Sequence, residues 1–396
     1  MNQTADNTVK PAAPGRPAGL AVLIFTTILT LSALYAPQPL LPVLMAEFGV
    51  SREAAAALTT VTFIPLCLAP LFYGYLLESF AALRLLRTAV LLLALSEVAF
   101  YLAPEFSQLL TLRLLQGLLV PAILTSLMTQ LSTLSRGAQV QRTMAIYIAA
   151  TILGGFLGRA CSGLIATSFG WRTSFLVLAA SLLLCFFLLR RLPAATGLSL
   201  VRPHRRLVFD VLRQPGVLPL YLMVFGLFFT FAAVMNFLPF RLTELYAEAN
   251  ELRIGLMYSG YAMGIVTSLG AVAVGRWLGG ERRAMALGLL VFGIALLGLS
   301  AQRVELLFAD MFLFCAAMFL VHATASGLVN RLVEGNKGMV NGLYVAFYYG
   351  GGTLGSYLPG YAYRYWGWWG FLLVLLGVTA LALVCLGRMK SRVATG

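Results

Sequence analysis

Long apolar stretches alternate with short polar segments from residue 19 to residue 387. Each stretch holds roughly the 20 mostly apolar residues that a helix needs to span the hydrocarbon core of a bilayer. The pattern therefore predicts an all-α integral membrane protein. Twelve transmembrane helices are expected, at residues 19–45, 54–77, 85–103, 107–131, 143–167, 173–190, 216–240, 254–275, 284–301, 306–330, 339–363 and 369–387.

The composition supports this prediction. Hydrophobic residues make up 60% of the chain and charged residues only 11%, whereas about 25% of an ordinary soluble protein is charged. All five cysteines lie in apolar stretches without the spacing of a disulfide framework or metal site, so we expect no metal and no cofactor. No cluster of His, Asp, Glu or Cys has catalytic spacing, which argues against a membrane enzyme.

Basic residues distinguish the two sides of the membrane. With both termini in the cytoplasm, 20 lysines and arginines fall on the cytoplasmic side and 6 on the other, while Arg113 and Arg159 remain inside predicted spans. This bias follows the positive-inside rule. The net charge of +14 therefore reflects orientation in a cell inner membrane and not nucleic-acid binding. The polar residues 1–18 are expected to lead into a retained first helix and not a cleaved signal peptide.

The chain also repeats itself at an offset of 197 residues. The aromatic and glycine positions of residues 144–171 recur in residues 341–368. Two similar halves predict two six-helix pseudo-symmetric bundles, and parallel repeats are typical of transporters whose halves rock about a site at their interface. The expected units are an N-terminal tail at 1–18, a first bundle at 19–190, a linker at 191–215, a second bundle at 216–387 and a C-terminal tail at 388–396.

Glycines recur at helical spacing in both copies of the repeat. Gly154 and Gly158 are four residues apart, as are Gly351 and Gly355. Such faces let helix backbones approach closely in lipid, where no hydrophobic effect drives helices together. We expect these glycines to pack helices together and to form the surface on which the two halves move.

Ionisable residues inside a span are costly, so each is a candidate for function. Arg113 stays charged at any relevant pH and is expected to hold an anionic partner, and Gln116 shares its helical face. Asp310 lies 197 residues after Arg113, at the equivalent depth of the second half. Two hypotheses stay open: Arg113 pairs with Asp310 across the interface, or it pairs with Glu97 within its own half.

A proton carrier must change its charge within the working pH range, which leaves Asp310, Glu97 and His322. Asp310 is the first candidate because its helix is expected to line the central cavity. The alternatives are a structural ion pair at Asp310, a hydrogen-bonded packing role for His322 and a Glu97 side chain directed toward the surface.

Residues that combine an apolar body with a polar tip suit an amphipathic ligand. On this basis, and by their places on the predicted helices, seven residues are candidates to line the substrate cavity. They are Tyr35, Gln38, Arg113, Gln116, Asn236, His322 and Tyr348.

These motifs together resemble the major facilitator superfamily over essentially the whole chain. Residues 113–117, Arg-Leu-Leu-Gln-Gly, are similar to that superfamily's fourth-helix motif, and residues 154–172 resemble the fifth helix of arabinose-efflux-like members of its drug:proton antiporter group. Residues 322–327 and 343–351 are similar to the tenth and eleventh helices of the same branch. The resemblance implies a transporter that works by alternating access and is coupled to protons.

Two segments depart from the family pattern. The loop between the second and third helices keeps Gly74 but has Glu78 in place of an aspartate and lacks the final Gly-Arg-Lys. In the family this loop latches the outward-facing state, so Glu78 is expected to act with Arg84 or Arg87. In the fifth helix, Arg159 stands where the antiporter motif has a proline. We expect these residues to act in gating.

The prediction as a whole is a secondary transporter, and not an enzyme, that exports a small organic or amphipathic compound in exchange for protons. A proton-linked importer or an uncoupled facilitator would share the same architecture and is the main alternative. A membrane enzyme or receptor is disfavoured. The expected partners are a small-molecule substrate, protons and the lipid bilayer, and the fold would suffice as a monomer.

Overall fold

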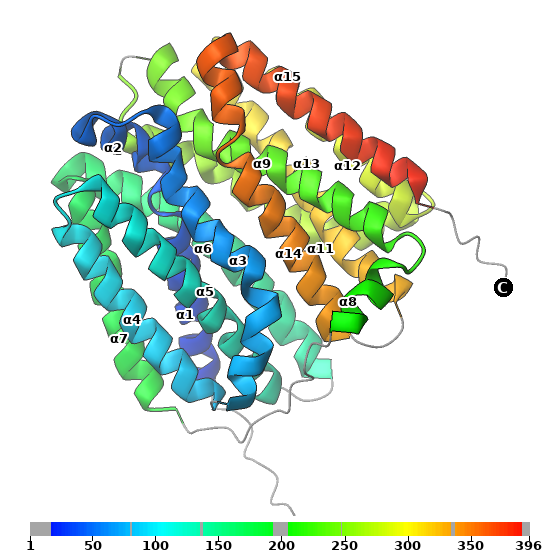
Figure 1. The fold of residues 1–396 in the computed structure, drawn as a ribbon, viewed down its shortest axis with the longest axis horizontal. Helices are drawn as coiled ribbons and strands as arrows, with labels where there is room; N and C mark the ends of the chain where they lie inside the picture. Colours follow the sequence, from blue (N-terminus) through cyan, green and yellow to red (C-terminus); the bar gives the residue numbers. More distant parts are fainter. Residues whose placement is uncertain are drawn as a thin grey trace, which may run out of the picture.

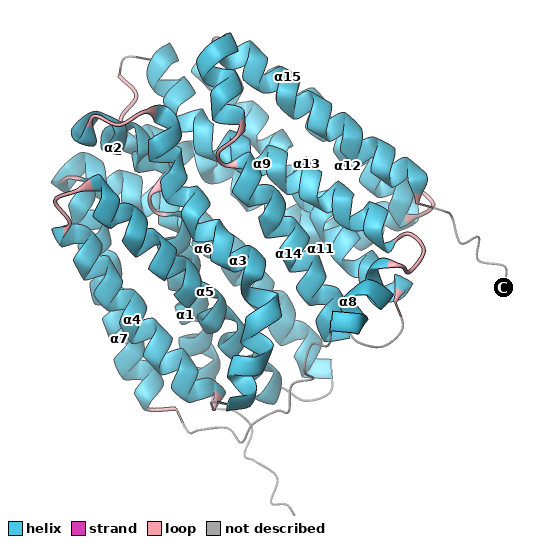
Figure 2. Cartoon of the chain, viewed as in Figure 1, coloured by secondary structure: helices cyan, strands magenta, loops and turns pink. Residues whose placement is uncertain are grey.

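The computed structural model describes residues 17–79, 81–134, 138–192, 205–246, 248–333 and 337–389. Within these ranges the side chains of residues 17, 70–79, 132–134, 138–141, 205–207 and 337 are not described. Regular structure in the described ranges is helical throughout, with no strand among them (Figure 2). The prediction of an all-α protein is therefore confirmed.

Each half of the chain supplies six helical tracks, some of them interrupted. The elements of the first half are α1 (Pro17–Tyr35), η1 (Gln38–Leu40), α2 (Leu41–Phe48), α3 (Arg52–Ser79), α4 (Ala82–Leu102), α5 (Phe106–Leu134), α6 (Ala138–Phe169) and α7 (Trp171–Arg190). The remaining elements are α8 (Arg205–Leu212), α9 (Val217–Leu245), α10 (Glu251–Met257), η2 (Tyr258–Tyr261), α11 (Ala262–Trp277), α12 (Glu281–Gly298), α13 (Val304–Leu332), α14 (Lys337–Gly355) and α15 (Pro359–Arg388).

The two halves form two bundles that lie side by side, with α1–α7 on the left of Figure 1 and α9–α15 on the right. Ten described helical segments are long and apolar enough to cross a membrane. The shorter α12 and α14 complete the twelve tracks that the structure describes. This is the predicted architecture of two six-helix bundles.

Proline interrupts two of the predicted spans. In the first, the helix breaks after Tyr35 and passes through the 3-10 turn η1 around Pro39. The eleventh was expected to reach residue 363, but α14 ends at Gly355 and Pro359 opens α15. Proline has no backbone N–H and cannot continue the hydrogen-bond ladder, although it fits the first turn of a new helix.

The repeat is visible in the backbone itself. Gly170 and Gly367, 197 residues apart, both have positive φ angles, of 82° and 68°. Each interrupts the helical path one residue before the last long helical stretch of its half, at Trp171 and Trp368. Glycine adopts this conformation without the steric penalty that a Cβ brings.

The repeated glycines pack helices within each half. A Cβ at Gly154 would lie 2.5 Å from the carbonyl oxygen of Ile28, and a Cβ at Gly351 would overlap that of Phe225, the residue 197 positions after Ile28. Gly158 and Gly355 approach Ser32 and Phe229, which are related by the same offset. The expectation that these glycines form the moving surface between halves is therefore wrong: they join α6 to α1 and α14 to α9.

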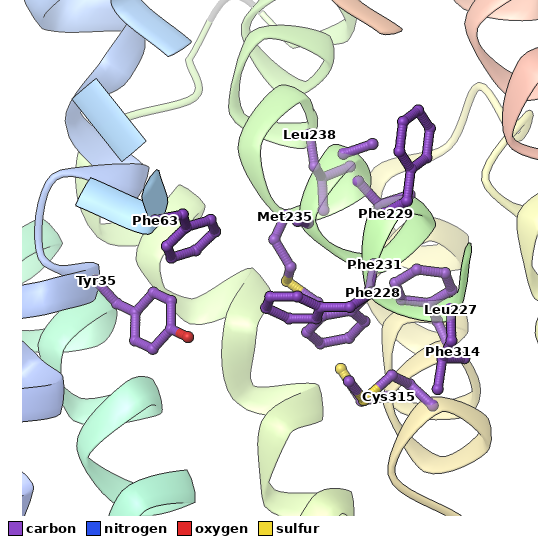
Figure 3. Packing of buried hydrophobic residues seen from close by; sticks show 14 of the residues in the cluster. Tyr35, Phe63, Leu227, Phe228, Phe229, Phe231, Met235, Leu238, Phe314 and Cys315 are labelled. Carbon is purple, nitrogen blue, oxygen red and sulfur yellow. The ribbon is translucent and has the colours of Figure 1, made fainter. Parts of the chain in front are cut away.

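A large aromatic cluster fills the space where the bundles meet. Figure 3 shows Tyr35 and Phe63 of the first half facing Phe228 and Met235 of the second, with the Tyr35 hydroxyl directed toward the second half. The ring of Phe63 lies 5.9 Å from that of Phe228. The core is thus continuous across the interface between the bundles.

Candidate functional site

The two halves are joined by an ion pair at one end of the bundle, which we call the closed end; it contains Arg52, Glu244 and Glu251. Arg52 Nη2 lies 2.6 Å from Glu244 Oε1, and the Tyr363 hydroxyl donates a 2.6 Å hydrogen bond to the other carboxylate oxygen. The Arg52 guanidinium also lies 4.0 Å from the centre of the Tyr363 ring. Charged and aromatic contacts therefore link α3 to α9 and α15.

A second contact at the closed end joins α6 to α10. Thr167 Oγ1 donates to Glu251 Oε2 at 3.0 Å and accepts from the backbone N–H of Leu252. A Cβ at Gly163 would overlap the carbonyl oxygen of Glu251, and one at Gly255 would lie 2.8 Å from that of Arg159. The two backbones meet without intervening side chains, and this close approach, unlike that of the repeated glycines, is between halves.

Asn236 adds a buried polar link between the halves. Its Nδ2 donates to the carbonyl oxygens of Ala56, at 3.0 Å, and Ser356, at 2.8 Å. The Ser356 hydroxyl lies 2.8 Å from that of Thr60. Asn236 is fully buried. In this structure it ties α9 to α3 and to the end of α14, so the cavity-lining role predicted from the sequence is not visible here.

The halves diverge toward the other end, which we call the linker end because α7 ends and α9 begins there. Contacts of α6 with α10 are far more extensive than its contacts with α11, which continues the same track. Ile148 lies three turns from Arg159 on the face of α6 that meets the second half, and it is 52% exposed, whereas Arg159 is 1% exposed. The interface is therefore sealed at one end and loose at the other.

Arg159 lies at the centre of this interface. Its Nε donates to Gln38 Oε1 at 2.6 Å, its Nη1 to the Gly155 carbonyl oxygen at 2.5 Å and its Nη2 to the Tyr261 hydroxyl at 3.3 Å. The guanidinium carbon also lies 4.1 Å from the ring centre of Tyr35 and 4.9 Å from that of Tyr258. We call these residues (Tyr35, Gln38, Gly155, Arg159, Tyr258 and Tyr261) the arginine cage.

The cage combines predicted and unpredicted residues. Tyr35 and Gln38 were predicted to contact substrate and Arg159 to act in gating, and the structure brings all three together. Tyr258 and Tyr261 come from the second half and were not predicted. They are tyrosines three residues apart at the start of the eighth span, where the interruption by η2 turns both toward Arg159.

Arg113 is enclosed within the first half. It donates to the carbonyl oxygens of Ala33, Leu34 and Leu58 and, at 2.6 Å, to Gln116 Oε1. Its side chain is fully buried. These bonds hold the guanidinium against α1 and α3, so Arg113 and Gln116 do not face the second half in this structure.

Glu97 is the acidic neighbour of Arg113. The two side chains interact electrostatically, and Gln116 lies beside Glu97. Both carboxylate oxygens of Glu97 and the Nε2 of Gln116 are buried without a hydrogen-bond partner. Among the described residues Arg113 forms an ion pair with neither Glu97 nor Asp310, so both pairing hypotheses stay open, with Glu97 in the same half as Arg113 and Asp310 in the other.

Asp310 lies away from Arg113, in the second half. Its carboxylate packs against the position where a Cβ of Gly298 would lie, so it sits between α13 and α12. Its Oδ2 is buried and has no hydrogen-bond partner. The 197-residue offset does place Asp310 and Arg113 on corresponding helices, but each side chain is directed into its own bundle.

His322 belongs to an aromatic group that continues from the interface toward the linker end. The Tyr344 hydroxyl lies 2.9 Å from His322 Nδ1 and donates to the His322 carbonyl oxygen. The Tyr348 ring lies 4.7 Å from the imidazole and stacks at 3.7 Å on Phe228. His322 and Tyr348, both predicted to line the cavity, are therefore neighbours.

The predicted latch after the second helix is only partly described. Gly74 and Glu78 lie on α3 where side chains fall outside the described residues. Arg84 lies in the first turn of α4 and is exposed. The role of this loop stays a prediction.

Comparison with known proteins agrees with the architecture. The model of the Major Facilitator Superfamily matches residues 23–279 and again residues 220–394. The two matches begin 197 residues apart, at the offset of the internal repeat.

Relatives by sequence are transporters. The inner membrane transport protein YnfM of Escherichia coli is 27% identical over 369 residues, which cover 92% of this chain and 88% of YnfM. An uncharacterized transporter of Buchnera aphidicola from Baizongia pistaciae is 24% identical, over 91% of this chain and 90% of its own length.

Solved structures share the fold at low sequence identity. A bacterial homologue of the human lysosomal transporter Spinster, in an inward-facing and occupied conformation, superposes with a TM-score of 0.77 at 13% identity and covers 96% of this chain and 97% of its own. The nucleoside transporter NupG, as its D323A mutant, gives a TM-score of 0.74 at 13% identity and covers 94% of this chain and 99% of its own.

The matches account for nearly the whole chain, both halves of the repeat and the arrangement of the bundles. They confirm the predicted fold and the prediction of a transporter and not an enzyme. This chain belongs to the major facilitator superfamily and is a membrane transporter of that type.

Proposed function

We propose that this transporter exports a small organic or amphipathic compound across the inner membrane in exchange for protons, as a member of the arabinose-efflux-like branch of drug:proton antiporters. The observation that supports alternating access is the contrast between an interface sealed by Arg52–Glu244 and α6–α10 and the divergence of α6 from α11. Rocking of the two halves would open the first and close the second.

The basic residues supply the orientation for this proposal. Their 20 to 6 distribution favours cytoplasmic termini, so the closed end would face the periplasm and the linker end the cytoplasm. The conformation is then inward-facing, the state in which an exporter takes up its substrate. The arginine cage and the rings of Phe63, Phe228 and Tyr348 are the proposed contacts for that substrate.

Proton antiport can be tested in inside-out vesicles with an imposed pH gradient, acidic inside. Addition of a transported compound to the outside is expected to release protons from the lumen, as measured with a fluorescent pH probe. A panel of 2-naphthoate, 2-naphthamide and 2-naphthylmethylamine covers anionic, neutral and cationic amphipathic compounds. Antiport would be rejected if the flux of a transported compound did not depend on the pH gradient. Net movement of the compound from the lumen to the outside, which is the cytoplasmic side in these vesicles, would favour an importer.

The proton carrier is proposed to be Asp310, with Glu97 as its rival. Both carboxylates contain a buried oxygen without a hydrogen-bond partner, a position that suits a group that binds and releases a proton. Asp310→Asn is expected to abolish substrate-dependent proton release and to leave membrane insertion intact. Glu97→Gln is the matched comparison in the same assay. If Glu97→Gln abolishes coupling and Asp310→Asn preserves it, the carrier is Glu97.

A further inference from the structure

Two arginines are fully buried in the membrane part of the structure. Arg113 is enclosed within the first half, where three backbone carbonyl oxygens and Gln116 accept its hydrogen bonds. Arg159 has no carboxylate within ion-pair distance among the described residues, and its partners are an amide, a carbonyl oxygen and the hydroxyl and rings of tyrosines. A buried charge without a counter-charge is costly. Arg159 is therefore the uncompensated positive charge at the interface.

The fold does not require an arginine at this position. The residue 197 positions after Arg159 is Ser356, which is fully buried at the corresponding place of the second half. There the Ser356 hydroxyl contacts Thr60 of the first half, and its carbonyl oxygen accepts a hydrogen bond from Asn236 of its own half. Since a small neutral residue suffices in one copy of the repeat, the charge at Arg159 calls for a reason other than packing.

The guanidinium retains hydrogen-bonding capacity. It has five N–H groups in a planar fork, and three hydrogen bonds from it are observed, to Gln38, Gly155 and Tyr261. The bond to Tyr261, at 3.3 Å, is the longest. Two further N–H groups can bind the two oxygens of a carboxylate, which arginine binds in a bidentate manner. A third N–H group becomes available if the Tyr261 hydroxyl moves away from Nη2.

Aromatic rings from both halves surround the same charge. Tyr35 lies 4.1 Å and Tyr261 4.5 Å from the guanidinium carbon. Tyr35 also packs against Phe63, which lies 5.7 Å from Tyr349. A planar apolar body attached to the anionic group would stack on these rings, as aromatic side chains favour.

Gly155 gives the site an approach from the linker end. Arg159, Gly155 and Thr151 follow one another at intervals of four residues, so they share one face of α6, which leads to the exposed Ile148. A Cβ at Gly155 would lie 3.4 Å from both Arg159 Nη1 and a ring carbon of Tyr261. Glycine at this position therefore keeps side-chain atoms away from the buried guanidinium on the face of α6 that leads to the linker end.

We propose that Arg159 binds the anionic group of the transported compound, so that the substrate is an organic anion such as an aromatic carboxylate. This inference rests on the proposed transport function and specifies its substrate class. The anion supplies the missing counter-charge and displaces Tyr261 from Nη2. Substrate binding would thus act directly on a contact between the two halves.

The test is binding of three probes of one shape to the purified full-length protein in detergent. 2-Naphthoate carries a carboxylate, 2-naphthamide is its neutral analogue and 2-naphthylmethylamine is a cation. We expect 2-naphthoate alone to raise the unfolding temperature at millimolar concentrations. Arg159→Gln is expected to weaken its binding by about tenfold or more, since a charge-assisted bond is lost, whereas Arg159→Lys retains part of it.

Gly155→Ala keeps the test valid if Arg159 variants fold poorly. The added methyl group makes an ordinary van der Waals contact and leaves the guanidinium in place, so it should weaken 2-naphthoate binding with little effect on the unfolding temperature without ligand. Gly270→Ala is the matched control, because a Cβ at Gly270 has nothing within 4 Å, and it should bind as the unmodified protein does.

Three results would each overturn the proposal. They are binding of 2-naphthoate that survives Arg159→Gln unchanged, no binding of 2-naphthoate at all, and equal binding of 2-naphthoate and 2-naphthamide. The vesicle assay separates this result from proton antiport. Arg159-dependent binding without a response to the pH gradient would reject antiport alone. Gradient-driven flux of only neutral or cationic probes would reject the anionic substrate alone.

Discussion

Replacing Gly163 with valine is expected to separate the two halves at the closed end and to reduce transport by about tenfold or more. The reason is that a strained core contact costs about 1–3 kcal/mol. The new Cβ would overlap the carbonyl oxygen of Glu251 on the opposite half. Backbone atoms cannot rotate away as a flexible side chain can, so α10 would have to move. The conformation seen here would lose stability relative to one in which the closed end has separated.

Thiol labelling can report this shift. In a background without the five native cysteines, Ser356→Cys places a thiol at a site that is fully buried in the closed end. A membrane-impermeant maleimide added from the side of the membrane that the closed end faces should label it faster when Gly163→Val is present. Labelling at an unchanged rate would show that the contact between α6 and α10 does not control the closed end.

Two other glycines serve as controls for Gly163→Val. Gly270→Val should change neither labelling nor transport, because nothing lies within 4 Å of its Cβ position. Gly154→Val should reduce the yield of folded protein, since Gly154 packs against Ile28 within one half. The three variants thus separate a defect in gating from a defect in helix packing.

Replacing Arg113 with methionine is expected to destabilise the protein by about 3–5 kcal/mol, because each buried acceptor left without a partner costs about 1–3 kcal/mol. The carbonyl oxygens of Ala33, Leu34 and Leu58 would lose their donor. The unfolding temperature of each variant in detergent is compared with that of the unmodified protein.

Double variants distinguish the two pairing hypotheses for Arg113. Combining Arg113→Met with Glu97→Gln should cost less than the sum of the single changes, because interacting residues are not additive. Combining Arg113→Met with Asp310→Asn should be additive within about 0.3–0.5 kcal/mol, the usual limit for independent sites. Strong coupling of Arg113 to Asp310, with none to Glu97, would contradict the arrangement seen here.

Much of the fold could be predicted because lipid imposes a simple rule. A segment that crosses a bilayer must be apolar for about 20 residues, and the duplicated glycines and aromatics fix where the second half begins. Periodicity alone gives no sign of the breaks at Pro39 and Pro359, because the chain stays apolar through them. Proline supplies the signal, since it cannot continue the hydrogen-bond ladder of a helix.

The candidate site was predicted only in part. Tyr35, Gln38 and Arg159 were selected as polar residues inside spans, and they do meet. Tyr258 and Tyr261, which complete the cage, lie more than 90 positions further along the chain, and nothing in the local sequence directs them to Arg159. Equal depth in the membrane likewise could not show that Arg113 and Asp310 are each directed into their own bundle.

The sequence by itself determined that this protein spans a membrane with two repeated helical bundles, because hydrophobic length and an internal repeat are properties of the chain that need no partner. Only the tertiary structure decided which charges are compensated and which helices seal the interface. A residue's depth follows from its position along a helix, but its neighbours depend on how that helix is rotated and on the bundle against which it packs.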